Sequence, residues 1–438
     1  MKKLFTLIAL VSFSFAGMAQ WLPQASGFET PSRGIKYLHA VDENVAWATA
    51  YDGSGGAAVI QEFTKTIDGG ENWVPGVVTG AEGTEFSMIF GIDAQTAYAA
   101  LYISTGGAQG IYVTHDGGST WARQTSASYS DAASFCNVVH FFDAQNGFAQ
   151  GDPINGDFEL YTTTDGGENW VAVPGANIPD PNSGEWGVVG YYDAVGDTIW
   201  FGTNKGRVYR STDRGYNWEA FSTTLTNKFI DVRFANSLHG LAQDKSSNST
   251  GTFAETLDGG ATWTTITATG PTLAAGFTFV PGMPMTVVAS GSNPDISNQL
   301  GLAYSYDGGH NWQFFEGTEG TQFLAVDFYN PTTGWAGAFN TDATNGGMYK
   351  YNGDFTPTFE IAKPDFNIYP NPATDVINIR AVENMSNVQL INLAGQVVYE
   401  NNVKSDNTVI QTSQFPKGIY MLAITSDRGV TARKVSIR

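Results

Sequence analysis

The sequence predicts an all-β protein, a seven-bladed β-propeller followed by a small Ig-like β-sandwich. Three observations lead to this prediction. An eight-residue pattern recurs six times, at intervals of 48, 49, 48, 45 and 49 residues, and such periods are typical of propeller blades or solenoid units. Short runs rich in Val, Ile, Phe, Tyr and Trp are separated by turns rich in Gly, Ser and Asn, as expected for strands. Beyond residue 363 the period ends and the charge becomes balanced.

The recurring pattern, here called the box, reads Ser or Thr, then Asp two residues later, Gly two further on and Trp three after that. Its copies are "TIDGGENW" (66–73), "THDGGSTW" (114–121), "TTDGGENW" (163–170), "STDRGYNW" (211–218), "TLDGGATW" (256–263) and "SYDGGHNW" (305–312). An Asp at a turn accepts hydrogen bonds from backbone N–H groups, and Gly takes a positive φ without steric cost. The Trp then folds its apolar face between neighbouring sheets. The boxes are therefore expected to fasten hairpins through Asp68, Trp73, Asp116, Trp121, Asp165, Trp170, Asp213, Trp218, Asp258, Trp263, Asp307 and Trp312.

A second element, two short strands joined by a tight turn, precedes every box and occurs seven times. With the strand that leads into the box and the strand that begins at its Trp, each unit supplies four antiparallel strands, and seven such units predict seven blades. The seventh unit ends in "GMYKYNGDFTP" and lacks the box. The segment that begins at Trp21 is expected to provide the missing fourth strand, which closes the ring and removes two exposed sheet edges.

The first residues predict export. Lys2 and Lys3 precede an apolar run from Leu4 to Phe15 and small residues that end at Ala19, which is typical of a secretory signal. No later stretch has the length of a transmembrane helix. The predicted organisation is a signal peptide at 1–19, the propeller at 20–362 and a separate β-sandwich of about seven strands at 363–438. The single cysteine, Cys136, allows no intramolecular disulfide.

The charge is concentrated in the propeller. Residues 21–363 carry 13 basic and 36 acidic side chains, a net charge of −23 within a total of −20. A surface of this sign repels nucleic acid and anionic membranes and favours solubility. The five histidines are scattered without the spacing of metal ligands, so neither a metal nor a cofactor is expected.

Candidate ligand-binding residues lie in the loops between the second and third strands of each unit, on the face opposite the boxes. These are Asp152, Asp157, Asp244, Asp295 and Asp342. Asp152 and Asp244 are the candidates for general acid work, because glycoside hydrolysis needs two carboxyl groups roughly 5 to 9.5 Å apart. The alternative is that these are ordinary solvated loop residues. Trp186, in "NSGEWGVVG", is expected either to stack on a sugar or peptide from the same face or to plug the core.

The box resembles the Asp-box, or bacterial neuraminidase, repeat, whose aspartates and tryptophans are structural. Families with this repeat include sialidases, xyloglucan-cleaving hydrolases, sortilin-type receptors and photosystem II assembly-factor-like proteins. Sialidases use three arginines and an Arg-Ile-Pro segment, and this propeller has six scattered arginines without such a segment. The length and the single propeller most resemble the photosystem II assembly-factor-like group, although the basic patch of that group is missing.

Residues 364–438 resemble the C-terminal sorting domain of type IX secretion cargo from Bacteroidetes. The resemblance rests on Tyr369-Pro370-Asn371-Pro372, Leu393-Ala394-Gly395-Gln396, Lys417-Gly418-Ile419-Tyr420 and Arg433-Lys434. It implies the type IX machinery as a partner and a location outside the cell, released or attached to the outer-membrane surface. The function expected from the whole sequence is a secreted binding or scaffold protein that recognises a glycan or protein on the loop face. The alternative is an extracellular glycoside hydrolase that uses loop-face carboxylates.

Overall fold

The structure is a computed structural model that describes residues 20–56, 58–246, 250–356, 366–392, 396–426 and 429–438. The predicted signal peptide and Leu393-Ala394-Gly395 of the sorting motif lie outside the described residues. The chain divides into two compact units, Met1–Thr356 and Pro357–Arg438, which we call the propeller unit and the C-terminal unit. No helix of the described residues is long and apolar enough to cross a membrane.

The propeller unit is built from seven four-stranded antiparallel blades, as the repeat predicts. In the first six blades the strands pair in chain order. Blade 1 comprises β2 (Arg33–Ala40), β3 (Ala46–Asp52), β4 (Glu62–Thr66) and β5 (Val74–Val77), and blade 2 comprises β6 (Thr84–Gly91), β7 (Ala97–Ile103), β8 (Gly110–Thr114) and β9 (Ala122–Gln124). Blade 3 comprises β10 (Cys136–Phe141), β11 (Gly147–Ile154), β12 (Asp157–Thr163) and β13 (Val171–Ala172), and it is followed by a short 3-10 turn, η1 (Gly175–Asn177).

The remaining blades have the same plan. Blade 4 comprises β14 (Gly187–Val195), β15 (Thr198–Thr203), β16 (Arg207–Ser211) and β17 (Glu219–Ser222), and blade 5 comprises β18 (Ile230–Phe234), β19 (Gly240–Asp244), β20 (Phe253–Thr256) and β21 (Thr264–Thr265). Blade 6 comprises β22 (Gly276–Val280), β23 (Met283–Ser292), β24 (Leu300–Ser305) and β25 (Gln313–Phe314). Blade 7 comprises β26 (Ala325–Asn330), β27 (Thr333–Asp342), β28 (Asn345–Tyr351) and the N-terminal strand β1 (Trp21–Ala25).

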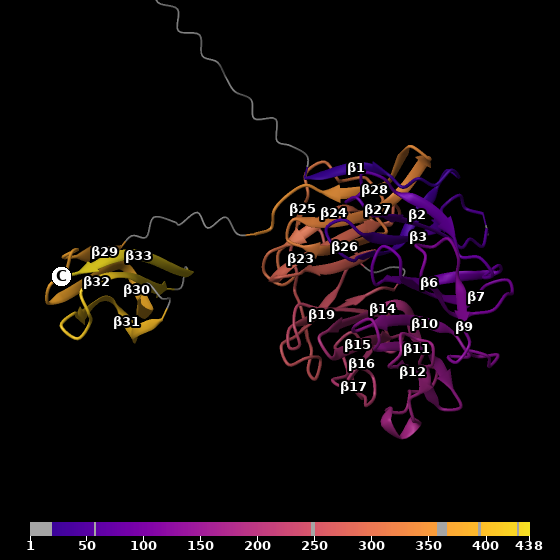
Figure 1. Cartoon of the computed structure of the whole chain (residues 1–438), viewed down its shortest axis with the longest axis horizontal. Helices are drawn as coiled ribbons and strands as arrows, with labels where there is room; N and C mark the ends of the chain where they lie inside the picture. The colour runs from indigo at the N-terminus through magenta and orange to yellow at the C-terminus, as the bar shows by residue number, and fades with distance from the viewer. Residues whose placement is uncertain (1–19, 57, 247–249, 357–365, 393–395, 427–428) are drawn as a thin grey trace, which may run out of the picture. The chain divides into compact units, whose positions relative to one another are not determined.

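The ring closes as the sequence predicts. β1 pairs antiparallel with β28, with Trp21 opposite Tyr351. The Trp21 ring is buried and lies 5.6 Å from the ring of Phe315 in blade 6. The first strand of each blade contacts the first strands of the two neighbouring blades, and in Figure 1 β2, β6, β10, β14 and β26 face the middle of the propeller unit.

The core lies between the blades. Seven apolar clusters each combine side chains of two neighbouring blades. The box Trp joins the cluster on the side of the preceding blade in several cases: Trp73 contacts Trp335 of blade 7, with ring centroids 6.3 Å apart, and Trp312 stacks on Phe253 of blade 5 at 5.4 Å. The six blades that carry a box are therefore each held to the preceding blade by a large side chain that the repeat places at one position.

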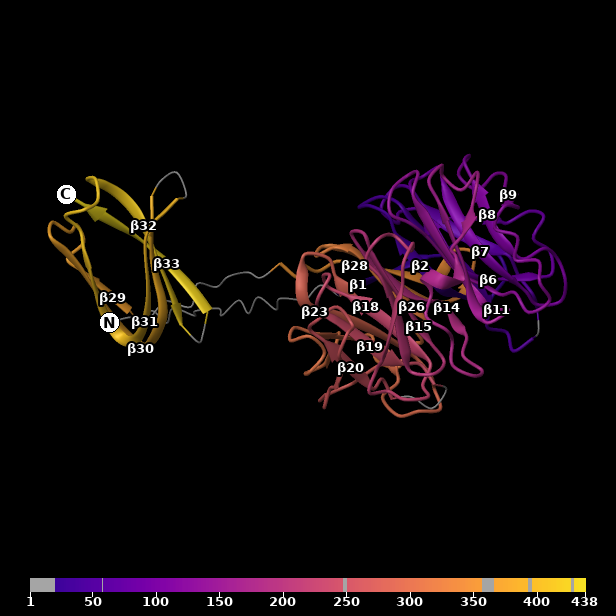
Figure 2. The same ribbon diagram turned by 90° about the horizontal axis from the view of Figure 1, so that it is seen from below.

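Strand order fixes the two faces of the propeller unit. In an antiparallel meander, the turns after the first and third strands lie on one face. The loop after the second strand and the connection to the next blade lie on the opposite face. The boxes occupy the turns after the third strands. We call their side the box face and the opposite side the loop face. Figure 2 gives a second view of the same strands.

In its described residues the C-terminal unit has five strands, where the sequence predicted about seven. These are β29 (Phe366–Tyr369), β30 (Val376–Ile391), β31 (Val397–Gln411), β32 (Gly418–Ser426) and β33 (Gly429–Ile437). The first part of β30 pairs with β29 and β31, and its second part pairs with β31 and β32 after a register shift between Arg380 and Met385. The count is lower because β30 continues through this register shift. The two long strands β30 and β31 therefore each belong to both parts of a small sandwich around one apolar core.

Candidate functional site

The boxes form identical hydrogen-bonded turns in six blades. In the first box, the Thr66 hydroxyl donates to Asp68 Oδ1 at 2.8 Å and accepts the N–H of Gly70 at 2.8 Å. The backbone N–H of Asn72 donates to Asp68 Oδ1 at 2.9 Å, and its side-chain amide donates to Oδ2 at 2.7 Å. Equivalent contacts recur in the other five boxes. Both oxygens of each box carboxylate are therefore engaged within the turn, which supports a structural role.

Asp152 is the loop-face carboxylate with the most unusual environment. It lies near the end of β11, where its Oδ1 accepts the Asn137 side-chain amide at 2.7 Å and the Gly187 N–H at 3.1 Å. Burial raises the pKa of Asp152 to about 6, against the smaller opposing effect of these two hydrogen bonds. No neighbouring carboxylate contributes to this shift among the described residues. A carboxyl group with a pKa near neutrality is suited to proton transfer, but hydrolysis of a glycoside needs a second one beside it.

Trp186 lies in the connection into blade 4, directly before the Gly187 that contacts Asp152. Its backbone N–H donates to Asn204 Oδ1 at 2.9 Å, and its carbonyl accepts the Asn204 N–H at 3.2 Å. The backbone is thus fixed to the β15–β16 loop, while the indole is 42% exposed. The Phe229 ring, 37% exposed on the connection into blade 5, lies 6.4 Å away. Trp186 and Phe229 form an exposed aromatic pair on the loop face, which we call the aromatic pair.

Asp244 lies close to this pair but is engaged elsewhere. Its carboxylate is buried, pairs with Lys228 Nζ at 3.2 Å and accepts the Ser246 N–H at 2.9 Å. Lys228 directly precedes Phe229 of the aromatic pair, and the Phe229 carbonyl accepts the N–H of Lys245, which follows Asp244. The structure therefore brings Asp152, Trp186 and Asp244 into one region formed by blades 3, 4 and 5.

The other three candidates lie in separate turns. Asp157 opens β12 and packs against Gly175 of η1. Asp295 is exposed in the β23–β24 loop, where its N–H donates to Asn293 Oδ1 at 3.0 Å. Asp342 is exposed and accepts hydrogen bonds from Thr344 and Asn345, and the Asn345 side-chain contact is the main reason its pKa lies below the ordinary value.

Sequence reasoning missed the carboxylates on the first strands of the blades. Asp193 of β14 accepts the Phe234 N–H of blade 5 at 2.5 Å, and Asp327 of β26 accepts the Ala40 N–H of blade 1 at 2.8 Å. Burial raises the pKa of each to about 6. Both carboxylates tie neighbouring blades together through backbone N–H groups. Each lies inside a first strand that otherwise reads as largely apolar, so nothing in the sequence signalled this role.

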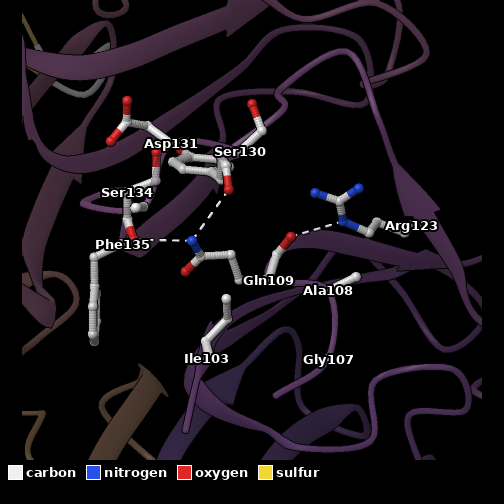
Figure 3. Close-up of a pocket in the computed structure, with 11 residues that line it drawn as sticks. Ile103, Gly107, Ala108, Gln109, Arg123, Ser130, Asp131, Ser134 and Phe135 are labelled. Carbon is white, nitrogen blue, oxygen red and sulfur yellow. Dashed lines mark hydrogen bonds between the residues drawn. The ribbon is translucent and has the colours of Figure 1, made fainter. Parts of the chain in front are cut away.

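Sequence reasoning also missed a cavity of about 490 Å³ on the loop face between blades 2 and 3. The β7–β8 loop and the connection from β9 to β10 form its walls, and Arg123 of β9 lies at one side (Figure 3). No group of three or more His, Cys, Asp or Glu side chains in the described part of the chain is arranged to hold a metal ion.

Two family models match parts of the chain. The secretion system C-terminal sorting domain matches residues 367–438, and the photosynthesis system II assembly factor YCF48 matches residues 102–224. The chain therefore carries a type IX sorting domain behind a propeller of the Asp-box class, and it is exported to the cell surface or the extracellular space. The predicted signal at the N-terminus agrees with this route. A comparison with curated proteins found no match.

Solved structures share the propeller fold. YCF48 bound to a D1 peptide is 16% identical with a TM-score of 0.52, and the match covers 77% of this chain and 98% of that chain. YCF48 from Cyanidioschyzon merolae is 16% identical with a TM-score of 0.54, covering 76% and 99%. The GH74 enzyme of Niastella koreensis is 16% identical with a TM-score of 0.49, covering 96% and 68%. At these identities the first two likenesses establish the fold, and the ligand has to be argued from the residues of this chain.

Proposed function

We propose that this exported protein is a binding protein that holds a glycan or a surface protein on the loop face of its propeller. The observation that carries the proposal is the aromatic pair: Trp186 is exposed although its backbone is fixed on both sides by Asn204. A rigidly held, exposed indole presents a large apolar face at little cost in conformational entropy, which suits stacking on a sugar or peptide. One structure of the same fold holds a D1 peptide, which supports a binding role without assigning the ligand.

The state of the carboxylates supports binding over cleavage. Asp244 is paired with Lys228. In the described residues, no second carboxylate contributes to the raised pKa of Asp152. A retaining or inverting glycosidase needs two carboxyl groups that flank one bond. The alternative, an extracellular glycoside hydrolase, draws support from the raised pKa of Asp152 alone.

Binding is tested with the exported chain on arrays of polysaccharides and outer-membrane proteins. We expect Trp186→Ala to weaken capture about 10- to 100-fold, because stacked aromatic side chains at such sites contribute about 1–3 kcal/mol. Tyr216→Ala is the matched control, since Tyr216 is also 42% exposed but lies in the fourth box, on the box face. Equal capture by wild type and Trp186→Ala would contradict the proposal.

The hydrolase alternative is tested on the same polysaccharides by the release of new reducing ends. Turnover that is abolished by Asp152→Asn would establish the hydrolase and displace the binding proposal. Asp244→Asn serves as the comparison, because its carboxylate is held by Lys228 and is the second acid candidate. We expect no turnover with wild type or with either variant.

A further inference from the structure

The cavity between blades 2 and 3 is large enough for a small organic ligand. Its volume of about 490 Å³ lies within the range of roughly 300 to 1,000 Å³ that is usual for ligand pockets. It is bounded on one side by Ile103 and the β7–β8 loop, and on the other by the connection that ends in Phe135 (Figure 3). The Phe135 ring stacks on Tyr102 with centroids 4.5 Å apart, so the apolar wall is fixed.

Arg123 differs from the other arginines of the propeller unit. Its Nε donates to the Gln109 carbonyl and its Nη2 to the Ser128 carbonyl, each at 2.7 Å. Within the described part of the chain, Nη1 has no hydrogen-bond partner and no carboxylate lies within 4 Å of the guanidinium. Every other arginine of the propeller unit pairs with at least one carboxylate, namely Arg33, Arg207, Arg210, Arg214 and Arg233.

The carboxylates around the cavity are already engaged. Glu159 accepts the Ser134 hydroxyl at 2.6 Å and the Tyr161 hydroxyl at 2.8 Å. Asp131 is exposed and accepts the Ala133 N–H at 2.9 Å, and Figure 3 shows it across the cavity from Arg123. Among the described residues neither of these carboxylates pairs with Arg123, so Nη1 of its guanidinium remains available at the cavity wall.

The connection from β9 to β10 is held in shape by a buried amide. Gln109 is 4% exposed, and its Nε2 donates to the carbonyls of Tyr129 at 3.1 Å and Ser134 at 2.9 Å. Its Oε1 has no hydrogen-bond partner, which is unusual for a buried acceptor. Tyr129 is held at φ 41°, in the left-handed region. A strained and buried support behind a polar wall is typical of a preformed site.

We propose that this cavity binds the carboxylate of a small organic acid, with the Arg123 guanidinium as its charged partner and Phe135 and Ile103 against the rest of the molecule. A guanidinium held by two carbonyls presents its remaining N–H groups in a fixed direction, which favours a carboxylate. The net charge of the domain opposes an anion only weakly, because charges farther away than about 8 Å are screened at physiological salt. This inference rests on the proposed function and adds a ligand class to the loop face.

The test is a calorimetric or NMR titration of the exported chain with phenylacetate and with phenylacetamide, and in a second arm with galacturonate and galactose. We expect each acid that binds to have a higher affinity than its neutral counterpart. Tighter binding of phenylacetate would identify the ligand as an apolar acid, and tighter binding of galacturonate would identify it as an acidic sugar. Arg123→Gln is expected to weaken binding about 10- to 100-fold, as for loss of a charged hydrogen-bond partner. Arg214→Gln is the control, because Arg214 pairs with Asp143 and Asp197 on the box face.

A second pair of variants keeps the Arg123 contacts intact. Ala132 lines the cavity and is exposed, so Ala132→Glu adds a negative charge without disturbing the fold. We expect Ala132→Glu to abolish acid binding and Ala132→Gln to retain it. Equal binding of acid and amide, no binding of either acid, or acid binding unaffected by Ala132→Glu would overturn the inference. Array capture that still depends on Trp186 would then leave the proposed function standing.

Discussion

Asp116 on the box face and Asp152 on the loop face show how one residue type is used in opposite ways. On the box face, hydrogen bonds lower the pKa of Asp116 to about 2, and the bond from the Thr120 hydroxyl has the largest effect. On the loop face, burial raises the pKa of Asp152 to about 6. A carboxylate with a low pKa is held as an anion by its own turn, whereas one with a raised pKa is poorly satisfied by its surroundings.

This difference separates architecture from recognition. The contacts of the box are repeated in six blades, with an Asn amide or a Thr hydroxyl as the donor to Oδ2, so the box specifies how a blade is fastened and carries no information about one ligand. The loop face changes from blade to blade: the exposed aromatic pair joins the connections into blades 4 and 5, and the Arg123 cavity lies between blades 2 and 3. Asymmetry within a repeated fold therefore points to the surface that binds.

The largest effect should come from a box tryptophan. Trp218 is 6% exposed and lies 5.1 Å from the rings of Phe148 and Phe201. We expect Trp218→Ala to lower the free energy of unfolding by about 3–5 kcal/mol, because it leaves a cavity between blades 3 and 4. Chemical denaturation followed by circular dichroism measures the change.

The control for this prediction is another apolar box residue that is not buried. Leu257 of the fifth box is 69% exposed, and Leu257→Ala should change the stability by less than about 0.5 kcal/mol. If Trp218→Ala and Leu257→Ala had similar effects, the boxes would not fasten the blades as their contacts indicate.

An intermediate effect is expected at Asp152, with a defined pH dependence. Its folded-state pKa of about 6 lies above the ordinary value of 3.8, so its contribution to stability is present below about pH 4 and is lost as the pH rises through 6. Asp152→Asn keeps an acceptor for Asn137 and Gly187. We expect this variant to be more stable than wild type by about 1–3 kcal/mol at pH 7.5 and equal to it near pH 4.

Asp342→Asn provides the opposite case on the same face. The pKa of Asp342 is lowered, chiefly by the Asn345 side-chain amide. Its contribution to stability is therefore present above the ordinary Asp pKa and is lost as the pH falls through the lowered pKa of the folded state. This variant should gain no stability at pH 7.5. A stabilisation of Asp342→Asn that matches that of Asp152→Asn would mean that general charge repulsion, and not local burial, sets the effect.

Sequence reasoning reached the fold because the fold is repeated. The box spacing predicted the blades, and Trp21 predicted the closure, since each depends on residue type at a fixed distance along the chain. The candidate site, which stays a prediction, was anticipated only in part: the sequence suggested Trp186 and Asp152 but not Phe229, because its contact with Trp186 joins two connections 43 positions apart. The cavity was missed because it forms between the β7–β8 loop and the connection from β9 to β10, whose packing leaves no pattern in the sequence. The Arg123 guanidinium, which has no carboxylate partner among the described residues, leaves no pattern there either.

The smallest effect tests the one box that departs from the pattern. Arg214 stands where the other five boxes have a glycine, and it adopts φ 63°, close to the 71–73° of those glycines. A side chain in this left-handed conformation costs roughly 1 kcal/mol, and the exposed pairs with Asp143 and Asp197 return less than about 1 kcal/mol. We therefore expect Arg214→Gly to be more stable than Arg214→Ala by about 1 kcal/mol, since both lose the pairs and only Ala keeps the strain. Equal denaturation midpoints for the two variants would mean that the turn relaxes around a side chain, and the glycine of the box would then reflect close packing rather than backbone conformation.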